Sequence, residues 1–172
     1  LATDADCDNS LTADDCNDDD PMIYPGAPEI WDDEIDQDCD GGDDVTCTGD
    51  FELDGWWFTL TGLEYCAVIT GSLKIIDTEL RNLDELSNLT SIEGSLELDY
   101  NGDLDDVDGL AELTDVGADL VIHANYDRSW HGHGHGVNLD GFSSLTTVGG
   151  NLEISSHSSN IDGLSSLTTV GG

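Results

Sequence analysis

A short repeat dominates the second half of this chain and limits the folds that it can adopt. Four segments align, each with a glycine at its second or third position followed by alternating apolar and polar residues. The period is roughly 22 to 24 residues, which is typical of solenoids, in which each repeat stacks on the last. The segments are ITGSLKI (69–75), IEGSLEL (92–98), VGADLVI (116–122) and VGGNLEI (148–154), and VGG (170–172) begins a fifth copy.

Apolar residues at a spacing of three form a ladder before each later copy. This spacing suits a helical or 3₁₀ turn with one inward face, and the alternating segments suit short strands. Stacked repeats bury a continuous column and pair their strands in parallel, about 4.8 Å apart. We therefore predict an all-β fold, a parallel β-solenoid over residues 67–172; a sandwich of hairpins is the alternative, and the strict repeat argues against it. The ladders are Leu83, Leu86, Leu89 and Ile92; Val107, Leu110, Leu113 and Val116; Leu139, Phe142, Leu145 and Val148; and Ile161, Leu164, Leu167 and Val170.

Glycines recur at the predicted corner before each strand, at Gly71, Gly94, Gly117 and Gly149. Either a positive φ or close packing of neighbouring backbones would require them there. The segment 123–138, HANYDRSWHGHGHGVN, is an insertion in the third repeat.

The two ends of the solenoid need covering. We expect residues 47–66 to form an N-terminal cap, with Phe51, Trp56, Trp57, Phe58 and Tyr65 packed on the first coil. The sequence stops at Gly172 in the middle of a corner, so we expect either that the protein continues or that another molecule covers the last coil. An open end exposes strand edges, which favours end-to-end assembly into a homo-oligomer or filament.

Negative charge dominates the composition, with 39 acidic and 3 basic residues and a net charge of −36. Nucleic acid and anionic membrane surfaces are therefore poor partners. No apolar run reaches the roughly 18 residues of a membrane span. Aspartates crowd residues 1–46, where carboxylates about 4 Å apart repel by roughly 4 kcal/mol at an effective dielectric near 20. Metal cations are the obvious counter-ions.

Aspartate spacing in this first segment indicates calcium sites, because Ca²⁺ prefers six to eight hard oxygen ligands and tolerates irregular loops. A solvated acidic face is the alternative, and Mg²⁺ fits less well because it demands stricter geometry. We expect two or more Ca²⁺ ions. The first candidate set is Asp4, Asp6, Asp8, Ser10, Thr12 and Asp15; the second is Asp36, Asp38, Asp40 and Asp44; the third is Asp15, Asn17 and Asp19.

All five cysteines lie within the first 66 residues, which favours disulfides and an oxidising compartment. Zinc is less well supported because no C-x-x-C pair is present. We expect Cys16–Cys39 to join the acidic loops and Cys47–Cys66 to fasten the cap, which leaves Cys7 unpaired. A secreted protein, extracellular or at the cell surface, follows from this interpretation.

Histidines alternate with glycine in the insertion, at His131, His133 and His135, with His123 at its base and His157 one repeat later. Such imidazoles could bind Zn²⁺ or Cu²⁺, although a polar loop without metal is the favoured interpretation. Tyr126, Arg128 and Trp130 could form a glycan platform, or the aromatic rings could pack on the neighbouring repeat.

The repeat resembles the bacterial form of the receptor L-domain through CAVITGSLKI, LDELSNLTSIEGSLEL, VDGLAELTDVGADLVI and LDGFSSLTTVGGNLEI, over about residues 66 to 172. This resemblance implies a right-handed β-helix, and in cell-surface receptors such domains bind ligands. The segment DDCNDDDPMIYPGAPEIWDDEIDQDCDGG (14–42) resembles the family called "Putative metal-binding motif" of secreted bacterial proteins. It departs from that pattern at Asn17, where Asp is usual, and at Asp33-Glu34, where Asp-Gly is common.

These observations favour a non-catalytic extracellular module, stabilised by calcium and used as a structural or adhesive element or as a subunit of a surface fibre. We expect no enzyme activity, because no G-x-S-x-G motif is present and the serines fall at repeat positions. The alternatives are a receptor-like domain that binds a glycan or peptide, and transition-metal capture by the histidine loop.

Overall fold

A computed structural model describes residues 16–17, 19–27, 35–39, 45–55, 60–123, 137–155 and 161–172. The chain divides into two compact units, Leu1–Val45 and Thr46–Gly172. Within the described residues, no helix is long and apolar enough to cross a membrane.

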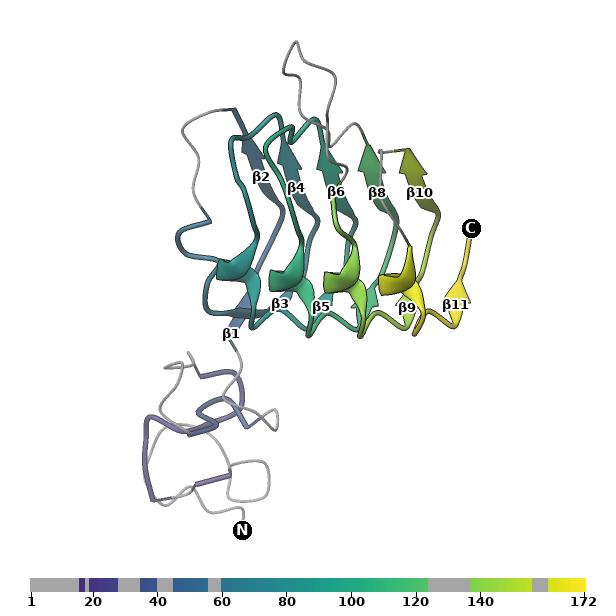
Figure 1. The fold of residues 1–172 in the computed structure, drawn as a ribbon. Coiled ribbons are helices and arrows are strands. Elements are labelled where there is room, and N and C mark those ends of the chain that lie inside the picture. Colours follow the sequence, from purple (N-terminus) through teal and green to yellow (C-terminus); the bar gives the residue numbers. More distant parts are fainter. Residues whose placement is uncertain are drawn as a thin grey trace. The chain divides into compact units, whose positions relative to one another are not determined.

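The second unit is a parallel β-solenoid, which confirms the predicted fold class (Figure 1). One sheet has the order β1-β3-β5-β7-β9-β11 and the other has the order β10-β8-β6-β4-β2, so each coil gives one strand to each sheet. The first sheet contains β1 (Val45–Cys47), β3 (Cys66–Ile69), β5 (Ser91–Ile92), β7 (Asp115–Val116), β9 (Thr147–Val148) and β11 (Thr169–Val170). The second contains β2 (Phe51–Asp54), β4 (Leu73–Ile76), β6 (Leu96–Asp99), β8 (Leu120–His123) and β10 (Leu152–Ser155).

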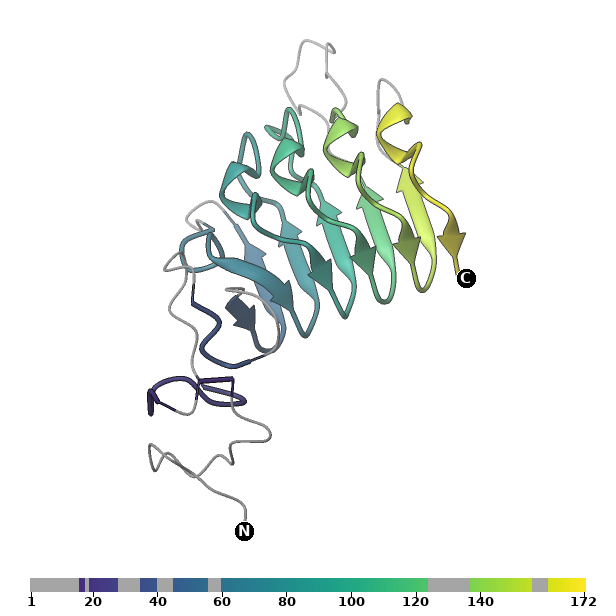
Figure 2. The same cartoon turned by 90° about the horizontal axis from the view of Figure 1, so that it is seen from below.

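Single turns of 3₁₀ helix stack along the remaining side of the coil (Figure 2). They are η1 (Asp84–Leu86), η2 (Asp108–Leu110), η3 (Asp140–Phe142) and η4 (Asp162–Leu164). The first three apolar ladders point inward as predicted, and Leu83, Leu86 and Leu89 are fully buried. In the last ladder, Ile161 and Val170 are 63% and 44% exposed, so the prediction fails for these two residues. The ladder spacing predicts that all four residues of a ladder belong to a helical turn. The last residue of each ladder differs, because Ile92 and its equivalents lie in strands of the first sheet. A two-residue strand is too short to show the alternation that reveals strands.

Two columns of glycine allow the coils to approach each other. The corner glycines do not have left-handed φ values; instead, a Cβ atom on Gly71 would lie 2.2 Å from the Gly49 carbonyl oxygen, and one on Gly149 would lie 2.1 Å from that of Gly117. Close backbone packing is therefore the reason for these glycines. A second column, which the sequence interpretation missed, lies in η2 to η4, where a Cβ on Gly109 would lie 1.7 Å from the Leu83 oxygen.

Hydrogen bonds of serine and threonine hydroxyls join successive coils. The Thr114 hydroxyl donates to the Thr90 carbonyl at 3.1 Å, and Thr146 donates to the Thr114 carbonyl at 3.2 Å. At the corner, the Ser95 N–H donates to the Ser72 hydroxyl at 3.1 Å. Because these bonds satisfy polar groups at every corner, the small polar residues of the repeat are structural.

Residues 47–66, expected to cap the solenoid, already contribute strands to both sheets. In the segment before β3, the Leu63 N–H donates to the Leu60 carbonyl at 2.9 Å, just as Leu86 donates to Leu83 at 2.8 Å one coil later. Phe51 packs against the core. Trp56, Trp57 and Phe58, which we expected to pack on the first coil, lie outside the described residues.

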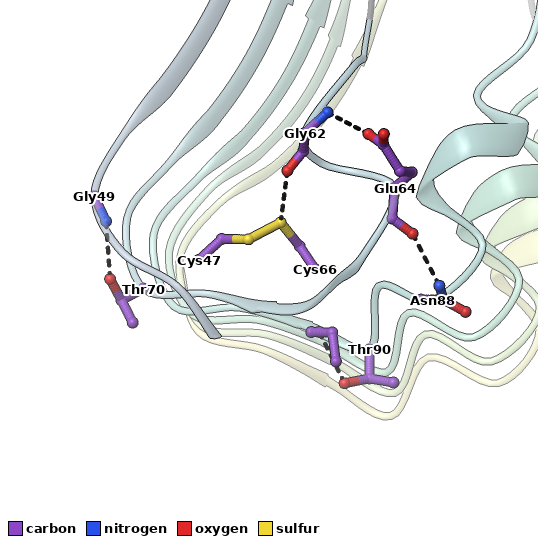
Figure 3. The surroundings of a disulfide bond; sticks show 9 residues. Cys47, Gly49, Gly62, Glu64, Cys66, Thr70, Asn88 and Thr90 are labelled. Carbon is purple, nitrogen blue, oxygen red and sulfur yellow. Dashed lines mark hydrogen bonds between the residues drawn. A yellow bond between two sulfur atoms is a disulfide. The ribbon is translucent and has the colours of Figure 1, made fainter. Parts of the chain in front are cut away.

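The predicted Cys47–Cys66 disulfide is present and lies in this first coil (Figure 3). Cys66 is fully buried at the ladder position that leucine occupies in later coils. Beside it, the Asn88 side-chain amide donates to the Glu64 carbonyl at 2.9 Å, which ties the next coil to the turn around the disulfide. The bond therefore replaces a core side chain and also closes the coil covalently.

Carboxylates stack on the outside of the 3₁₀ column, one from each turn, at Asp84, Asp108, Asp140 and Asp162. Partial burial is the largest influence on Asp108 and raises the pKa of its carboxyl, and repulsion from Asp106, Asp140 and Asp84 raises it further. A carboxyl whose pKa is higher in the folded protein than in the unfolded chain destabilises the fold above that pKa.

Asp108→Asn is therefore expected to raise the melting temperature of the solenoid slightly at neutral pH. The gain stays below about 0.5 kcal/mol, because solvent screens an exposed carboxylate. It disappears as the pH falls towards 3.8, the ordinary pKa, where the wild-type carboxyl is protonated. Thermal melts across this pH range measure the effect. Glu112→Gln, which removes an exposed charge elsewhere, is the control, and an equal gain from both variants would show that only net charge matters.

Candidate metal centre in the N-terminal unit

A tight turn organises the described part of the first unit. In the segment YPGA, the Tyr24 carbonyl accepts a hydrogen bond from the Ala27 N–H at 2.9 Å, and Gly26 has a φ of 84°. Proline second and a left-handed glycine third are typical of a type II turn. The turn therefore follows from the local sequence.

The same segment pairs with residues 35–39. The Tyr24 N–H donates to the Gln37 carbonyl at 2.8 Å, and the Gly26 N–H donates to the Asp38 carbonyl at 3.1 Å. Ile23, Ala27 and Gln37 are buried. Within its described residues, the unit thus has only a small buried cluster, so apolar burial alone gives it little stability.

A disulfide joins the two acidic segments, as predicted. Cys16 and Cys39 are bonded, with their Cα atoms 5.7 Å apart. Asn17 follows Cys16 and Asp38 precedes Cys39, so the bond draws residues of two separate predicted calcium sets towards one region. Cys39 has a φ of 62°, in the left-handed region that residues other than glycine adopt rarely.

Four of the predicted calcium ligands lie within the described residues. Asn17 and Asp19 are exposed, and Asp36 and Asp38 are half-buried. The Asn17 carbonyl accepts hydrogen bonds from the Asp19 N–H at 2.7 Å and the Asp20 N–H at 3.0 Å, which fixes a turn of acidic residues. The remaining predicted ligands lie outside the described residues and are Asp4, Asp6, Asp8, Ser10, Thr12, Asp15, Asp40 and Asp44.

The donor atoms of this region indicate which metal it fits. Among the described residues of the whole protein, no three His, Cys, Asp or Glu side chains come together as a complete metal site. In the described part of this unit, the side-chain donors are chiefly carboxylate and amide oxygens, and the sulfurs of Cys16 and Cys39 are bonded to each other. The one soft donor there is the thioether of Met22, which is 65% exposed. Oxygen donors of this kind suit a hard cation such as Ca²⁺ better than copper or zinc.

The histidine prediction falls largely outside the described residues, as do Tyr126, Arg128 and Trp130. His131, His133, His135 and His157 are not described, and only His123, at the end of β8, is. Its Nε2 atom lies 3.1 Å from Oε1 of Glu153. The sequence interpretation did not single out Glu153, because this residue belongs to the neighbouring coil.

Comparison with known families finds one match in this unit. A family model described as "Putative metal-binding motif", whose label names copper binding, matches residues 15–44. No curated protein and no solved structure matches the chain. The similarity of the solenoid to the receptor L-domain stays a prediction. The chain carries a sequence similar to a known metal-binding motif, and this motif and the disulfides fit an extracellular metal-binding structural module.

Proposed function

We propose that this chain is a non-catalytic, secreted structural or adhesive module whose N-terminal unit binds Ca²⁺. The observation that carries the proposal is the donor set of the matched motif. Its described donors are oxygens apart from Met22, and its two described cysteine sulfurs are consumed by a disulfide. The copper in the family label calls for softer nitrogen or sulfur donors.

Charge and burial support a structural role for the ion. The first unit buries few apolar side chains in its described part, and its sequence is rich in aspartate. Bound Ca²⁺ would offset carboxylate repulsion and add to the free energy of unfolding, since a ligand that binds only the folded state stabilises it. The ion would take the place of a hydrophobic core.

The serines of the solenoid support a non-catalytic role. Ser166 donates its hydroxyl to the Ser143 carbonyl at 2.5 Å, and the hydroxyl of Ser95 accepts from the Asp119 N–H at 3.2 Å. These hydroxyls join one coil to the next. Repeated hydrogen bonds of this kind account for the serines without a nucleophile.

Removal of calcium is expected to lower the melting temperature of the N-terminal unit and to leave the solenoid transition in place. At a free Ca²⁺ concentration of 100 times Kd, the lost stabilisation is about 2.7 kcal/mol. Differential scanning calorimetry with and without a calcium chelator measures it. An unchanged melt in excess chelator would exclude calcium as the stabilising ion.

Copper binding, which the family label names, is tested by isothermal titration of the same protein. We expect Ca²⁺ to bind with the same affinity in wild type and in Met22→Leu, because the thioether is not a calcium ligand. Cu²⁺ or Cu⁺ that displaces Ca²⁺ and binds more weakly to Met22→Leu would instead support the copper label. End-to-end assembly, glycan or peptide binding and metal capture by the histidine loop stay predictions, and most residues of that loop lie outside the described residues.

A further inference from the structure

A histidine and a glutamate meet on the outer face of the second sheet. In β8 and β10, Ile122 and Ile154 face the core, so the alternation of the strand turns His123 and Glu153 outward. The strands pair in parallel with His123 opposite Ser155, and Glu153 is therefore a diagonal neighbour of the histidine. Both residues are held on regular strands of a stacked sheet.

The contact between them has the distance of an ion pair but is not a hydrogen bond. Nε2 of His123 lies 3.1 Å from Oε1 of Glu153, and within the described residues this buried nitrogen makes no hydrogen bond. A hydrogen bond needs the N–H to point at its acceptor, whereas two ligands of one metal ion lie side by side and both point at the ion. The distance between the two atoms therefore fits two ligands of one metal ion, which need not point at each other.

We propose that His123 and Glu153 bind a transition-metal ion, Zn²⁺ or Cu²⁺, on the face of the solenoid. Zinc lies about 2.0–2.1 Å from imidazole nitrogen and carboxylate oxygen, so two ligands at a tetrahedral angle are about 3.3 Å apart. The observed separation of 3.1 Å is close to this value. Imidazole with carboxylate is also a donor pair that suits these ions. Because Nε2 is buried, the imidazole must turn towards solvent to admit the ion, and water molecules would then complete the coordination on the exposed side of Glu153.

The charges on the same face distinguish this pair from its neighbours. Asp99 lies in register with His123 on the preceding strand and adds negative charge beside it. Two strands earlier, Lys74 pairs with Glu97 at 3.2 Å, so that carboxylate already has a cationic partner. The His123 and Glu153 side chains are 28% and 64% exposed, which leaves the glutamate free to admit an ion from solvent.

Metal titration of a protein without the other histidines tests this site. The background variant carries His131→Ala, His133→Ala, His135→Ala and His157→Ala, and saturating Ca²⁺ is present to occupy the acidic oxygens of the first unit. We expect one equivalent of Zn²⁺ by isothermal titration. With Cu²⁺, we expect an electron paramagnetic resonance spectrum that shows coupling to a single imidazole nitrogen.

Single substitutions in this background decide the assignment. His123→Ala should abolish uptake, and Glu153→Gln should weaken it by more than about tenfold, since the loss of an outer-shell partner alone costs about that much and Glu153 would be a direct ligand. Glu97→Gln, which removes a carboxylate from the same face, should leave the affinity unchanged. A background protein that takes up no metal, or an affinity that Glu153→Gln does not alter, would overturn the proposal. Because Glu153 is exposed, Glu153→Gln should fold, and its metal affinity tests the proposal even if His123→Ala does not fold. The result is independent of calcium binding by the first unit.

Discussion

Gly109→Ala is expected to destabilise the solenoid by about 3 kcal/mol, near the upper end of the usual cost of overpacking. The added Cβ would lie 1.7 Å from the Leu83 carbonyl oxygen and 2.2 Å from its carbon, and both are backbone atoms of the previous coil. Neither can move aside alone, because the Leu86 N–H donates to the same oxygen at 2.8 Å. The two 3₁₀ turns must separate, which opens the ladder of buried leucines beneath them. A thermal melt should show the loss as a drop of roughly 10 °C.

Glu85→Ala is the matched control for this variant. Glu85 is the second residue of η1, as Gly109 is of η2, and it is exposed. Its replacement removes an exposed carboxylate and adds no atom, so the change in stability should stay within about 0.5 kcal/mol. Equal melting temperatures for Gly109→Ala and wild type would show that the turns are less tightly stacked than the structure indicates.

The sequence predicts the solenoid because its ladders repeat. Leu86, Leu110 and Phe142 each stand three residues after the first member of their ladder and share one environment, the buried column, so the pattern shows where they lie. The glycine of the 3₁₀ turns was missed for the opposite reason. Glycine is required there because a carbonyl oxygen of the previous coil lies where a Cβ atom would be. Nothing within the D-G-L segment itself indicates that contact.

The start of the solenoid was also harder to infer than its middle. The segment before β3 has Leu60 and Leu63 at ladder positions, but Cys66 stands where later coils have leucine. The aromatic residues of this segment and the need to cover the end of the solenoid predict a cap, whereas a cysteine suggests a disulfide before it suggests a core position. In the first unit, the turn at Asp19 and Asp20 was not predictable either. The backbone N–H groups of these two residues donate to the Asn17 carbonyl, and the spacing of aspartates along the chain does not indicate these bonds.

Of the candidate sites, the sequence predicts the disulfide correctly, whereas the calcium ligands stay a prediction and the neighbour of His123 was missed. The predicted disulfide Cys16–Cys39 is confirmed, and carboxylate spacing indicated a hard cation. The neighbour of His123 was not predictable from the insertion in which the histidine was noticed. Glu153 reaches it only because β8 and β10 are adjacent strands, a relation set by the size of the intervening loop and the register of the coil.

Loss of the Cys47–Cys66 disulfide is the second large effect that we expect. Cys47→Ala with Cys66→Ala should lower the stability of the solenoid by at least about 3 kcal/mol, because the entropy of closing a loop of this size in the unfolded chain accounts for that much and the loss of the buried Cys66 side chain adds to it. The two cysteines are separated by 19 residues. Denaturant unfolding followed by far-UV circular dichroism measures the loss. Cys16→Ala with Cys39→Ala, in the other unit, should leave the solenoid transition unchanged and weaken calcium binding instead.

A third variant separates the covalent contribution of this disulfide from its packing. Cys47→Ala with Cys66→Leu places leucine at the position that Leu89 occupies one coil later, where the side chain is fully buried. The leucine should recover the apolar burial, worth about 2 kcal/mol at most, but not the closed loop. Stability midway between wild type and the double alanine variant is therefore expected. Full recovery would mean that the first coil needs only a filled core and gains nothing from a covalent link, whereas no recovery would assign the whole effect to loop closure.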